Sequence, residues 1–189
     1  PAGNKNAALP CISAALLTSD PVILENVPRV RDVETLLEII KSLGAGVEWL
    51  DEGTLRLEAA HLNSTSLDPV LAARIRASIL LAGPLLARFR RVLIPPPGGD
   101  VIGRRRLDTH FLAFRGLGAD IAVHVNSLEI TASQLKGGDI FLDEPSVTAT
   151  ENALFLAVLC EGTTTIYNAA CEPHIASLSH LLNGMGADI

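Results

Sequence analysis

Three stretches of the chain end in nearly the same way: residues 42–49 read SLGAGVEW, residues 116–123 read GLGADIAV, and residues 184–189 read GMGADI. In each stretch a glycine follows the last apolar residue of a segment with helical periodicity. Upstream of each glycine the same order of elements recurs, which is the signature of an internal repeat. The sequence therefore predicts a fold in which one supersecondary unit is used three times.

The first unit shows the pattern most fully. After a short strand and turn, residues 31–44 (RDVETLLEIIKSLG) place apolar residues at the spacing of a helix with one buried face. Asp32 is expected to cap the start of this helix, and Gly44 is expected to end it in the left-handed conformation. Residues 46–59 (GVEWLDEGTLRLEA) then alternate on both sides of a turn, which predicts a two-stranded hairpin.

The other two units repeat this order with one variation each. Residues 91–132 contain a strand, a long loop rich in proline and glycine, a helix and a hairpin, whereas residues 163–189 end inside the expected hairpin. A mostly apolar helix is expected before each unit, at residues 5–20, 73–89 and 146–162. Helices that are apolar over most of their surface are buried. We therefore expect an α/β (α+β) fold in which helices form the interior and sheets lie outside.

Composition bounds the class of protein. A chain of 189 residues with 48% hydrophobic residues is long enough for one domain with a real core, and it has no apolar run of roughly 18 residues that could span a membrane. The net charge of −6 and the 4% aromatic content disfavour a nucleic-acid-binding protein. Three widely spaced cysteines without a C-x-x-C pair, and no recognisable export signal, favour a reducing, cytoplasmic location. We expect a single domain over residues 1–189, with repeats at about 5–66, 67–135 and 136–189, the last incomplete.

The loop at residues 95–103 is the first candidate for chemistry. Its prolines stiffen the backbone and its glycines permit unusual backbone geometry, so the loop and the Arg104–Arg106 cluster could present N–H groups and guanidinium groups to an anion. The alternative is a solvent-exposed turn with a charged rim. Asp100, between the glycines, is either a turn former or a proton donor or acceptor beside a substrate.

Two further positions carry charge next to apolar helices. Lys5 and Asn6 open the first of these helices, where a lysine is unfavourable beside the positive helix end unless an anion binds there; an ordinary surface lysine is the alternative. Arg76 lies at the head of the second helix and needs a partner, either a structural carboxylate or a ligand phosphate. Residues 88–91 are expected to form a solvated, basic helix end.

Several common sites are not predicted. The five histidines lack the spacing of metal ligands, so no metal site is assigned. The serines lack the nucleophile-elbow motif, and no Walker or G-x-G-x-x-G loop is present.

Five blocks of the chain closely resemble the UDP-N-acetylglucosamine enolpyruvyl transferases: NKNAALP, RIRASILLAGPLLARF, PPGGDVIGRRRLD, PSVTATENAL and EGTTTIYNAACEPHI. The resemblance implies transfer of the enolpyruvyl group of phosphoenolpyruvate to the 3'-hydroxyl of UDP-N-acetylglucosamine, with release of phosphate and without a metal or organic cofactor. This reaction supplies peptidoglycan synthesis. The resemblance also implies one inside-out α/β barrel domain of a longer, two-domain polypeptide.

The resemblance further implies roles for individual residues. Lys5, Arg76 and Arg105 would bind phosphoenolpyruvate, Asn6 would bind the amino sugar, and Asp100 would be the general acid. The uracil pocket would be formed by Arg106, Leu107, Asp108 and Thr109, and the diphosphate would lie near Ser146, Val147 and Thr148. Within this family the base for the sugar hydroxyl belongs to the second domain, so we expect the present chain alone to be inactive.

Three positions depart from the usual pattern of the family. Asp100 stands where most members have a cysteine, and members with aspartate there resist the epoxide fosfomycin, which alkylates the thiol. Arg106 replaces a usual proline and Thr148 a usual glycine, which changes the uracil pocket and the surroundings of the diphosphate. The alternatives are the sibling enzyme that acts on shikimate 3-phosphate and a non-catalytic binding module of the same fold.

Overall fold

A computed structural model describes residues 3–98 and 106–189 of the chain. In chain order, its elements are α1 (Lys5–Ala14), η1 (Ala15–Leu17), β1 (Val22–Leu24), α2 (Arg31–Ser42), β2 (Gly46–Trp49), β3 (Leu55–Glu58), α3 (Pro69–Ala72), η2 (Arg76–Leu81), α4 (Ala82–Phe89), β4 (Arg91–Ile94), α5 (Asp108–Gly116), β5 (Asp120–His124), β6 (Ser127–Thr131), β7 (Asp139–Phe141), α6 (Val147–Ala157), β8 (Thr165–Tyr167) and α7 (Pro173–Gly184), where η denotes a 3-10 helix.

The strands form separate small sheets that follow the repeat. The first sheet has the order β1-β3-β2 and the second β4-β6-β5, and both are antiparallel. Strands β7 and β8 pair in parallel in a third, two-stranded sheet. In the first two sheets the strand that precedes the repeat helix pairs with the second strand of the hairpin that follows it. The hairpins predicted from alternation are therefore confirmed.

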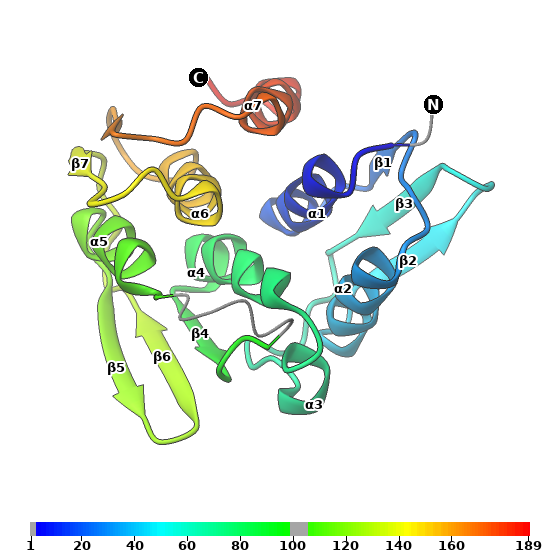
Figure 1. The fold of residues 1–189 in the computed structure, drawn as a ribbon, viewed down its shortest axis with the longest axis horizontal. Helices are drawn as coiled ribbons and strands as arrows, with labels where there is room; N and C mark the ends of the chain where they lie inside the picture. Colours follow the sequence, from blue (N-terminus) through cyan, green and yellow to red (C-terminus); the bar gives the residue numbers. More distant parts are fainter. Residues whose placement is uncertain (1–2, 99–105) are drawn as a thin grey trace.

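The interior is made of helices. Figure 1 shows α1, α4 and α6 in the middle of the molecule and the strands at its periphery. Every residue from 82 to 87 in α4 and from 149 to 156 in α6 is buried. In α4 this follows from a stretch that is apolar throughout, because such a helix has no polar face to offer to water, whereas the buried stretch of α6 also contains Thr150, Glu151 and Asn152. The predicted inside-out α/β barrel arrangement is confirmed.

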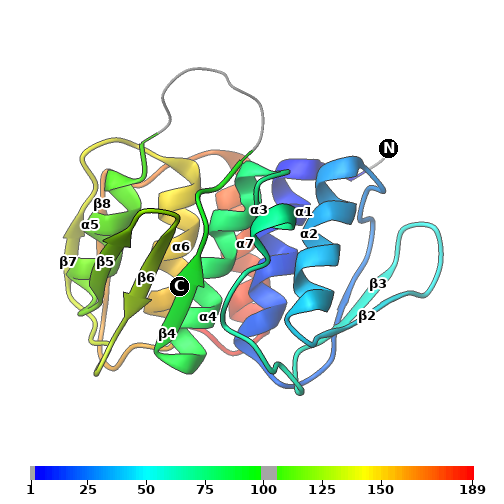
Figure 2. The ribbon, with the colours of Figure 1, turned by 90° about the horizontal axis from the view of Figure 1, so that it is seen from below.

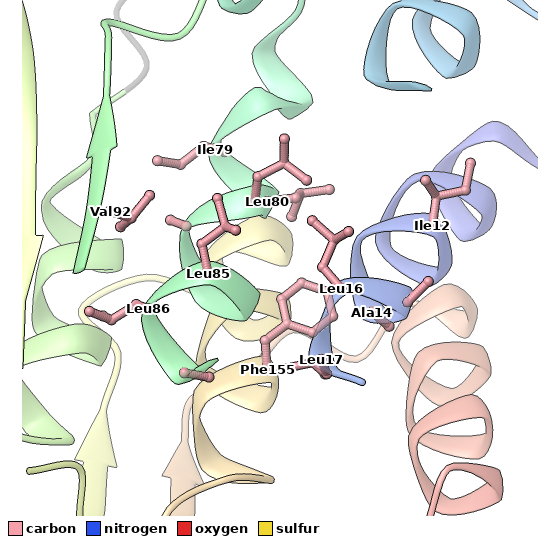
Figure 3. Close-up of a cluster of buried hydrophobic side chains, with 14 of the residues drawn as sticks. Ile12, Ala14, Leu16, Leu17, Ile79, Leu80, Leu85, Leu86, Val92 and Phe155 are labelled. Atoms are coloured by element: carbon pink, nitrogen blue, oxygen red, sulfur yellow. The ribbon is translucent and has the colours of Figure 1, made fainter. Parts of the chain in front are cut away.

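The central helices share one continuous core. Figure 3 shows the ring of Phe155, from α6, among Leu16 and Leu17 of η1 and Leu80 and Leu85 of η2 and α4. These side chains are at most 9% exposed. Burying a leucine or phenylalanine stabilises a fold by about 1.5–3 kcal/mol, so contacts between different repeats hold the domain together.

The long helices run nearly side by side, so their ends collect at the two ends of the molecule (Figure 2). The predicted glycine stops are confirmed at the C-terminal ends of α2, α5 and α7. The glycines that follow these ends, Gly44, Gly118 and Gly186, have φ angles of 99°, 95° and 105°. A residue with a side chain is strained in this left-handed region. The three related sequence stretches therefore mark the same structural event, a helix end.

Two helix predictions were wrong in detail. Asp32 does not cap α2, because the helix begins at Arg31 after Val30, which makes no side-chain capping bond. The Asp32 carboxylate instead accepts a hydrogen bond from Lys5. Within residues 73–89 the α-helix begins only at Ala82, and Arg76–Leu81 forms a 3-10 helix. Pro84, the third residue of α4, has no N–H to donate, which suits the first turn of a helix, where N–H groups have no partner within the helix.

The first and third leading helices are shorter than predicted. Helix α1 ends at Ala14 and passes into η1, which ends at Leu17, rather than continuing to residue 20. Helix α6 ends at Ala157, five residues before the predicted end at residue 162. No helix in the described ranges is long and apolar enough to cross a membrane. The three cysteines, all within those ranges, are free thiols.

The basic segment at residues 88–91 is not simply solvated. The Arg88 guanidinium donates to the carbonyl oxygens of Leu16, Thr18 and Ala59 over distances of 2.8, 3.0 and 3.1 Å. The prediction of a solvated helix end was therefore wrong for Arg88, because the ends of other elements turn their free carbonyls toward it.

Candidate active site

A cavity of about 370 Å³ lies where several helices begin. Its walls come from the first turns of α1, η2, α6 and α7, elements that are far apart in the sequence. The lining residues are Asn6, Leu9, Pro10, Ala77, Leu80, Val147, Thr148, Glu151, Glu172 and His174. Free N–H groups at helix starts carry partial positive charge, so this end of the domain suits polar ligands.

Glu151 gives the cavity an unusual carboxyl group. Its side chain is 1% exposed, and its Oε1 atom has no hydrogen-bond partner among the described residues. Burial, followed by the negative charge of Glu172, raises the pKa of Glu151 to about 8. At neutral pH this carboxyl group is mostly protonated, so it can both donate and accept hydrogen bonds toward a ligand.

A buried polar network lies directly behind the cavity wall. The His110 ring, 2% exposed, has Thr148 Oγ1 at 3.1 Å from Nε2 and Asn152 Nδ2 at 3.1 Å from Nδ1. Burial, assisted by the positive charge of Arg76, lowers the pKa of His110 to about 3. The imidazole is therefore neutral over the physiological pH range, and the network positions Thr148 at the cavity.

The residues assigned by resemblance fall into two groups. Asn6, Val147 and Thr148 line the cavity together. Ser146 precedes them as the N-cap residue of α6, although its side chain makes no capping bond. The structure therefore brings together the residue assigned to the amino sugar and those assigned to the diphosphate.

The second group lies at the start of α5. Leu107 is the N-cap residue of this helix, and Asp108 at its first position accepts a hydrogen bond of 2.6 Å from Arg106 Nε. Arg76 Nη2 donates to the Arg106 carbonyl oxygen at 3.3 Å. The hydroxyl of Thr109 donates to a carboxylate, that of Asp143, at 2.6 Å.

Lys5, which the resemblance assigns to phosphoenolpyruvate, does not line the cavity in this structure. The Lys5 amine is bound to the Asp32 carboxylate at 2.7 Å, so it is directed to α2 rather than to the cavity. Asp100 and Arg105 lie outside the described residues. Of Lys5 and Asn6, adjacent in sequence, only Asn6 lines the cavity.

Sequence reasoning missed several polar residues of the site. Glu151, Glu172 and His174 line the cavity, and His110 and Asn152 support it. One signal was available, because Glu151 and Asn152 are the polar pair inside an otherwise apolar helix, ENALFLA. Within residues 3–98 and 106–189 no group of three or more His, Cys, Asp or Glu side chains could hold a metal ion.

The fold is shared with a solved enolpyruvyl transferase. The crystal structure of the enolpyruvyl transferase NikO from Streptomyces tendae superimposes with a TM-score of 0.85 and 24% sequence identity, covering 100% of this chain and 44% of that one, which establishes the fold. The family profile of EPSP synthase (3-phosphoshikimate 1-carboxyvinyltransferase) matches residues 1–189, so the chain belongs to this family.

Curated relatives indicate a particular branch of the family. UDP-N-acetylglucosamine 1-carboxyvinyltransferase from Bradyrhizobium diazoefficiens is 60% identical over 189 residues, which is 100% of this chain and 44% of the relative. The protein of that name from Treponema denticola is 54% identical over 187 residues, covering 99% of this chain and 44% of the relative. The resemblance drawn from the five sequence blocks is confirmed, and the chain spans less than half the length of these relatives.

Proposed function

We propose that the chain forms one domain of a protein that transfers the enolpyruvyl group of phosphoenolpyruvate to the 3'-hydroxyl of UDP-N-acetylglucosamine and releases phosphate. The observation that carries the proposal is the 60% identity, over the whole chain, to a relative named for this activity. The cavity at the helix starts supports it, since a partly enclosed space lined by apolar side chains and a few polar groups suits a sugar. Peptidoglycan precursor synthesis in the cytoplasm is the corresponding role.

In this proposal the charged and the uncharged parts of the substrates bind to different residues. The Arg76 guanidinium donates to the Arg106 carbonyl oxygen, and its positive charge acts on His110, which lies behind Thr148 of the cavity wall. With Arg105, Arg76 would attract the phosphate groups, although the whole chain carries a net charge of −6. Asn6 would bind the amino sugar, and the segment from Arg106 to Thr109 would bind uracil.

Lys5 would change partners when substrate binds. Its bond to Asp32 joins two partly exposed side chains, with 48% and 37% of their surfaces exposed, and ion pairs of this kind contribute little to stability. A phosphate that carries more charge than one carboxylate can therefore compete for the Lys5 amine.

The repeat boundaries given above and a second domain in the same polypeptide are also part of this proposal.

The reaction needs an acid beside the methylene carbon of phosphoenolpyruvate. Protonation of that carbon builds positive charge at the neighbouring carbon, to which the sugar hydroxyl then adds. Asp100 is proposed as this acid, since a carboxyl group can deliver the proton that a thiol delivers in most relatives of this kind. Arg105, five positions further on, would hold the departing phosphate.

A substitution at Asp100 tests this assignment in the complete protein. The wild type should keep its transferase activity after prolonged exposure to fosfomycin, because a carboxylate is a far poorer nucleophile toward the epoxide than a thiolate. Asp100→Cys should remain active and then lose its activity under the same exposure, with one added fosfomycin mass at residue 100.

The wild type is the matched control, because it already contains Cys11, Cys160 and Cys171 and shows any alkylation elsewhere. An Asp100→Cys enzyme that stays fully active after long exposure would remove Asp100 from the reacting position.

A further inference from the structure

Gly3 lies against the backbone of Asn26, in the connection between β1 and α2. A Cβ atom added to Gly3 would overlap the Asn26 carbonyl oxygen and would come to 3.0 Å from Cδ of Pro28. In a close-packed structure no residue with a side chain fits at position 3 unless the backbone shifts. The path by which the chain enters α1 therefore depends on a glycine at this position.

The Asn26 carbonyl is held in place by the hairpin of the first repeat. Asn26 has a φ angle of 56°, in the left-handed region that asparagine tolerates better than most residues. The next residue, Val27, donates its N–H to the Gly53 carbonyl at 2.8 Å, in the turn between β2 and β3. Arg29 Nη2 donates to the Asp51 carbonyl in the same turn at 3.0 Å. The connection is therefore fixed to the hairpin on one side and contacts Gly3 on the other.

The third repeat contains a turn of the same kind. Asn168, directly after β8, also has a φ angle of 56°, and its Nδ2 atom donates to the Leu142 carbonyl at 2.9 Å. Leu142 belongs to the segment that leads to α6, just as Gly3 belongs to the segment that leads to α1. In both units a left-handed asparagine after the first strand contacts the chain that enters the leading helix. The contact of Gly3 with Asn26 is therefore a feature of the repeat.

The cap of α1 connects Gly3 to the residues that are proposed to bind the substrates. Asn4, the N-cap residue, accepts a hydrogen bond of 2.8 Å from the Asn6 N–H through its Oδ1 atom. Its carbonyl oxygen accepts from the Ala8 N–H at 3.0 Å. Because these bonds join Asn4 to the first turn of α1, a shift of Gly3 also shifts Lys5 and Asn6.

The same part of the chain supplies the partner of Lys5. After Asn26 the connection leads to α2, where Asp32, in the first turn, accepts a hydrogen bond of 2.7 Å from the Lys5 amine. Helices α1 and α2 lie side by side (Figures 1 and 2). The β1–α2 connection and the first turn of α2 therefore contact the start of α1 at two points, Gly3 and Lys5.

We propose that Gly3 is a positioning residue, whose contact with Asn26 sets the place of the first turn of α1 and thereby directs Lys5 and Asn6 to the substrates. The inference rests on the proposed function, in which Lys5 binds phosphoenolpyruvate and Asn6 the amino sugar. It adds a residue that does not line the cavity. A displacement of about 1 Å in such a position can lower a rate roughly 100-fold.

Steady-state kinetics of the complete protein test the inference. Gly3→Ala should lower kcat/KM for phosphoenolpyruvate by roughly 10- to 100-fold, because Lys5 and Asn6 are displaced together. Gly46→Ala is the matched control and should behave as the wild type, since a Cβ atom at this exposed position would have its nearest contact at 3.6 Å. Urea unfolding identifies conditions in which every variant is fully folded, and the rates are compared there.

Substitutions of Asn26 test the same contact from its other side. Asn26→Gly keeps the left-handed turn and should have nearly wild-type activity, whereas Asn26→Val places a β-branched residue at a strained φ and should lower kcat/KM as Gly3→Ala does. Because both changes disturb one contact, the double variant Gly3→Ala, Asn26→Val should lose much less than the product of the two single losses. The Asn26 pair suffices if Gly3→Ala does not fold.

The other outcomes separate two kinds of failure. Wild-type kcat/KM for Gly3→Ala would overturn the inference, and so would equal activities of Asn26→Gly and Asn26→Val or multiplicative losses in the double variant. If the wild type releases no phosphate from phosphoenolpyruvate in the presence of UDP-N-acetylglucosamine, the proposed function itself fails.

Discussion

Glu151 is a buried carboxyl group in the cavity wall, and burial away from water favours the neutral form of a carboxyl group. Removing a carboxylate from water is costly, and the nearby Glu172 adds repulsion, so the pKa of Glu151 rises from 4.5 to about 8. The folded protein therefore holds a proton that the unfolded chain releases. Such a group couples the stability of the domain to pH.

The sign of this coupling gives a prediction. Between about pH 4.5 and pH 8 the folded state binds more protons than the unfolded state, so the free energy of unfolding should fall as the pH rises. Glu151→Gln cannot ionise and should abolish this part of the slope. Above about pH 8 the variant should be more stable than the wild type by an amount on the order of a few kcal/mol.

Urea unfolding at a series of pH values measures this difference. Glu52→Gln, the same chemical change at an exposed position, is the control and should run parallel to the wild type. Parallel curves for Glu151→Gln and the wild type would show that Glu151 is not buried in its neutral form.

At the residue scale, the sequence predicted only part of the site. Asn6, Val147 and Thr148 could be assigned because they lie in blocks that resemble the family, and all three line the cavity. His110 and Glu151 could not be assigned, because their roles depend on burial by helices that are distant in the sequence. Lys5 was placed on the correct helix, but its contact with Asp32 depends on how α1 packs on α2.

At the scale of elements, Arg88 connects three separate parts of the chain. It lies near the end of α4 and donates to the carbonyl oxygens of Leu16 in η1, of Thr18 directly after η1, and of Ala59 directly after β3. Carbonyls at helix and strand ends lack partners within their own element. One guanidinium group supplies donors to all three and joins the first repeat to the second leading helix.

Removal of this group should therefore be costly. Arg88→Met keeps most of the apolar stem and should lower the free energy of unfolding by about 1–3 kcal/mol, because partly buried carbonyls lose their donor. Thermal or urea unfolding of the domain measures the loss.

Arg74→Met is the matched control, since Arg74 pairs with Glu38 at 3.1 Å between side chains that are 48% and 53% exposed. Its effect should stay below about 1 kcal/mol. An Arg88→Met variant no less stable than Arg74→Met would refute the joining role of Arg88.

Elements were predictable where the signal is local. Helix α2, its glycine stop at Gly44 and the hairpin after it follow from periodicity and turn chemistry. The 3-10 helix Arg76–Leu81 was missed because its path is fixed by distant groups as well as by Pro84. Asn152, on α6, binds both the Ile79 carbonyl and the Gly83 N–H, and no local pattern announces such a contact.

At the scale of the whole molecule, the repeat explains both the fold and the position of the cavity. Each unit begins with an apolar helix, and burial of these helices side by side brings the starts of α1, η2 and α6 to one end. The inside-out arrangement could be predicted because helices that are apolar over most of their surface are buried in the centre of a protein. The cavity could not be predicted, because it forms between repeats.

The chain covers 44% of each of the two curated relatives named above, so the complete reaction is proposed for the longer protein. The resemblance assigns the base for the sugar hydroxyl to a second domain of the polypeptide. Residues 1–189 by themselves are expected to give no turnover, and any binding of the nucleotide sugar should be weak.

Release of phosphate from phosphoenolpyruvate by the complete protein tests the central claim most directly. The assay is run with UDP-N-acetylglucosamine, with shikimate 3-phosphate and without an acceptor. We expect release of one phosphate per enolpyruvyl group transferred with UDP-N-acetylglucosamine, and no release above background in the other two cases. Release with shikimate 3-phosphate alone, or no release with any acceptor, would contradict it.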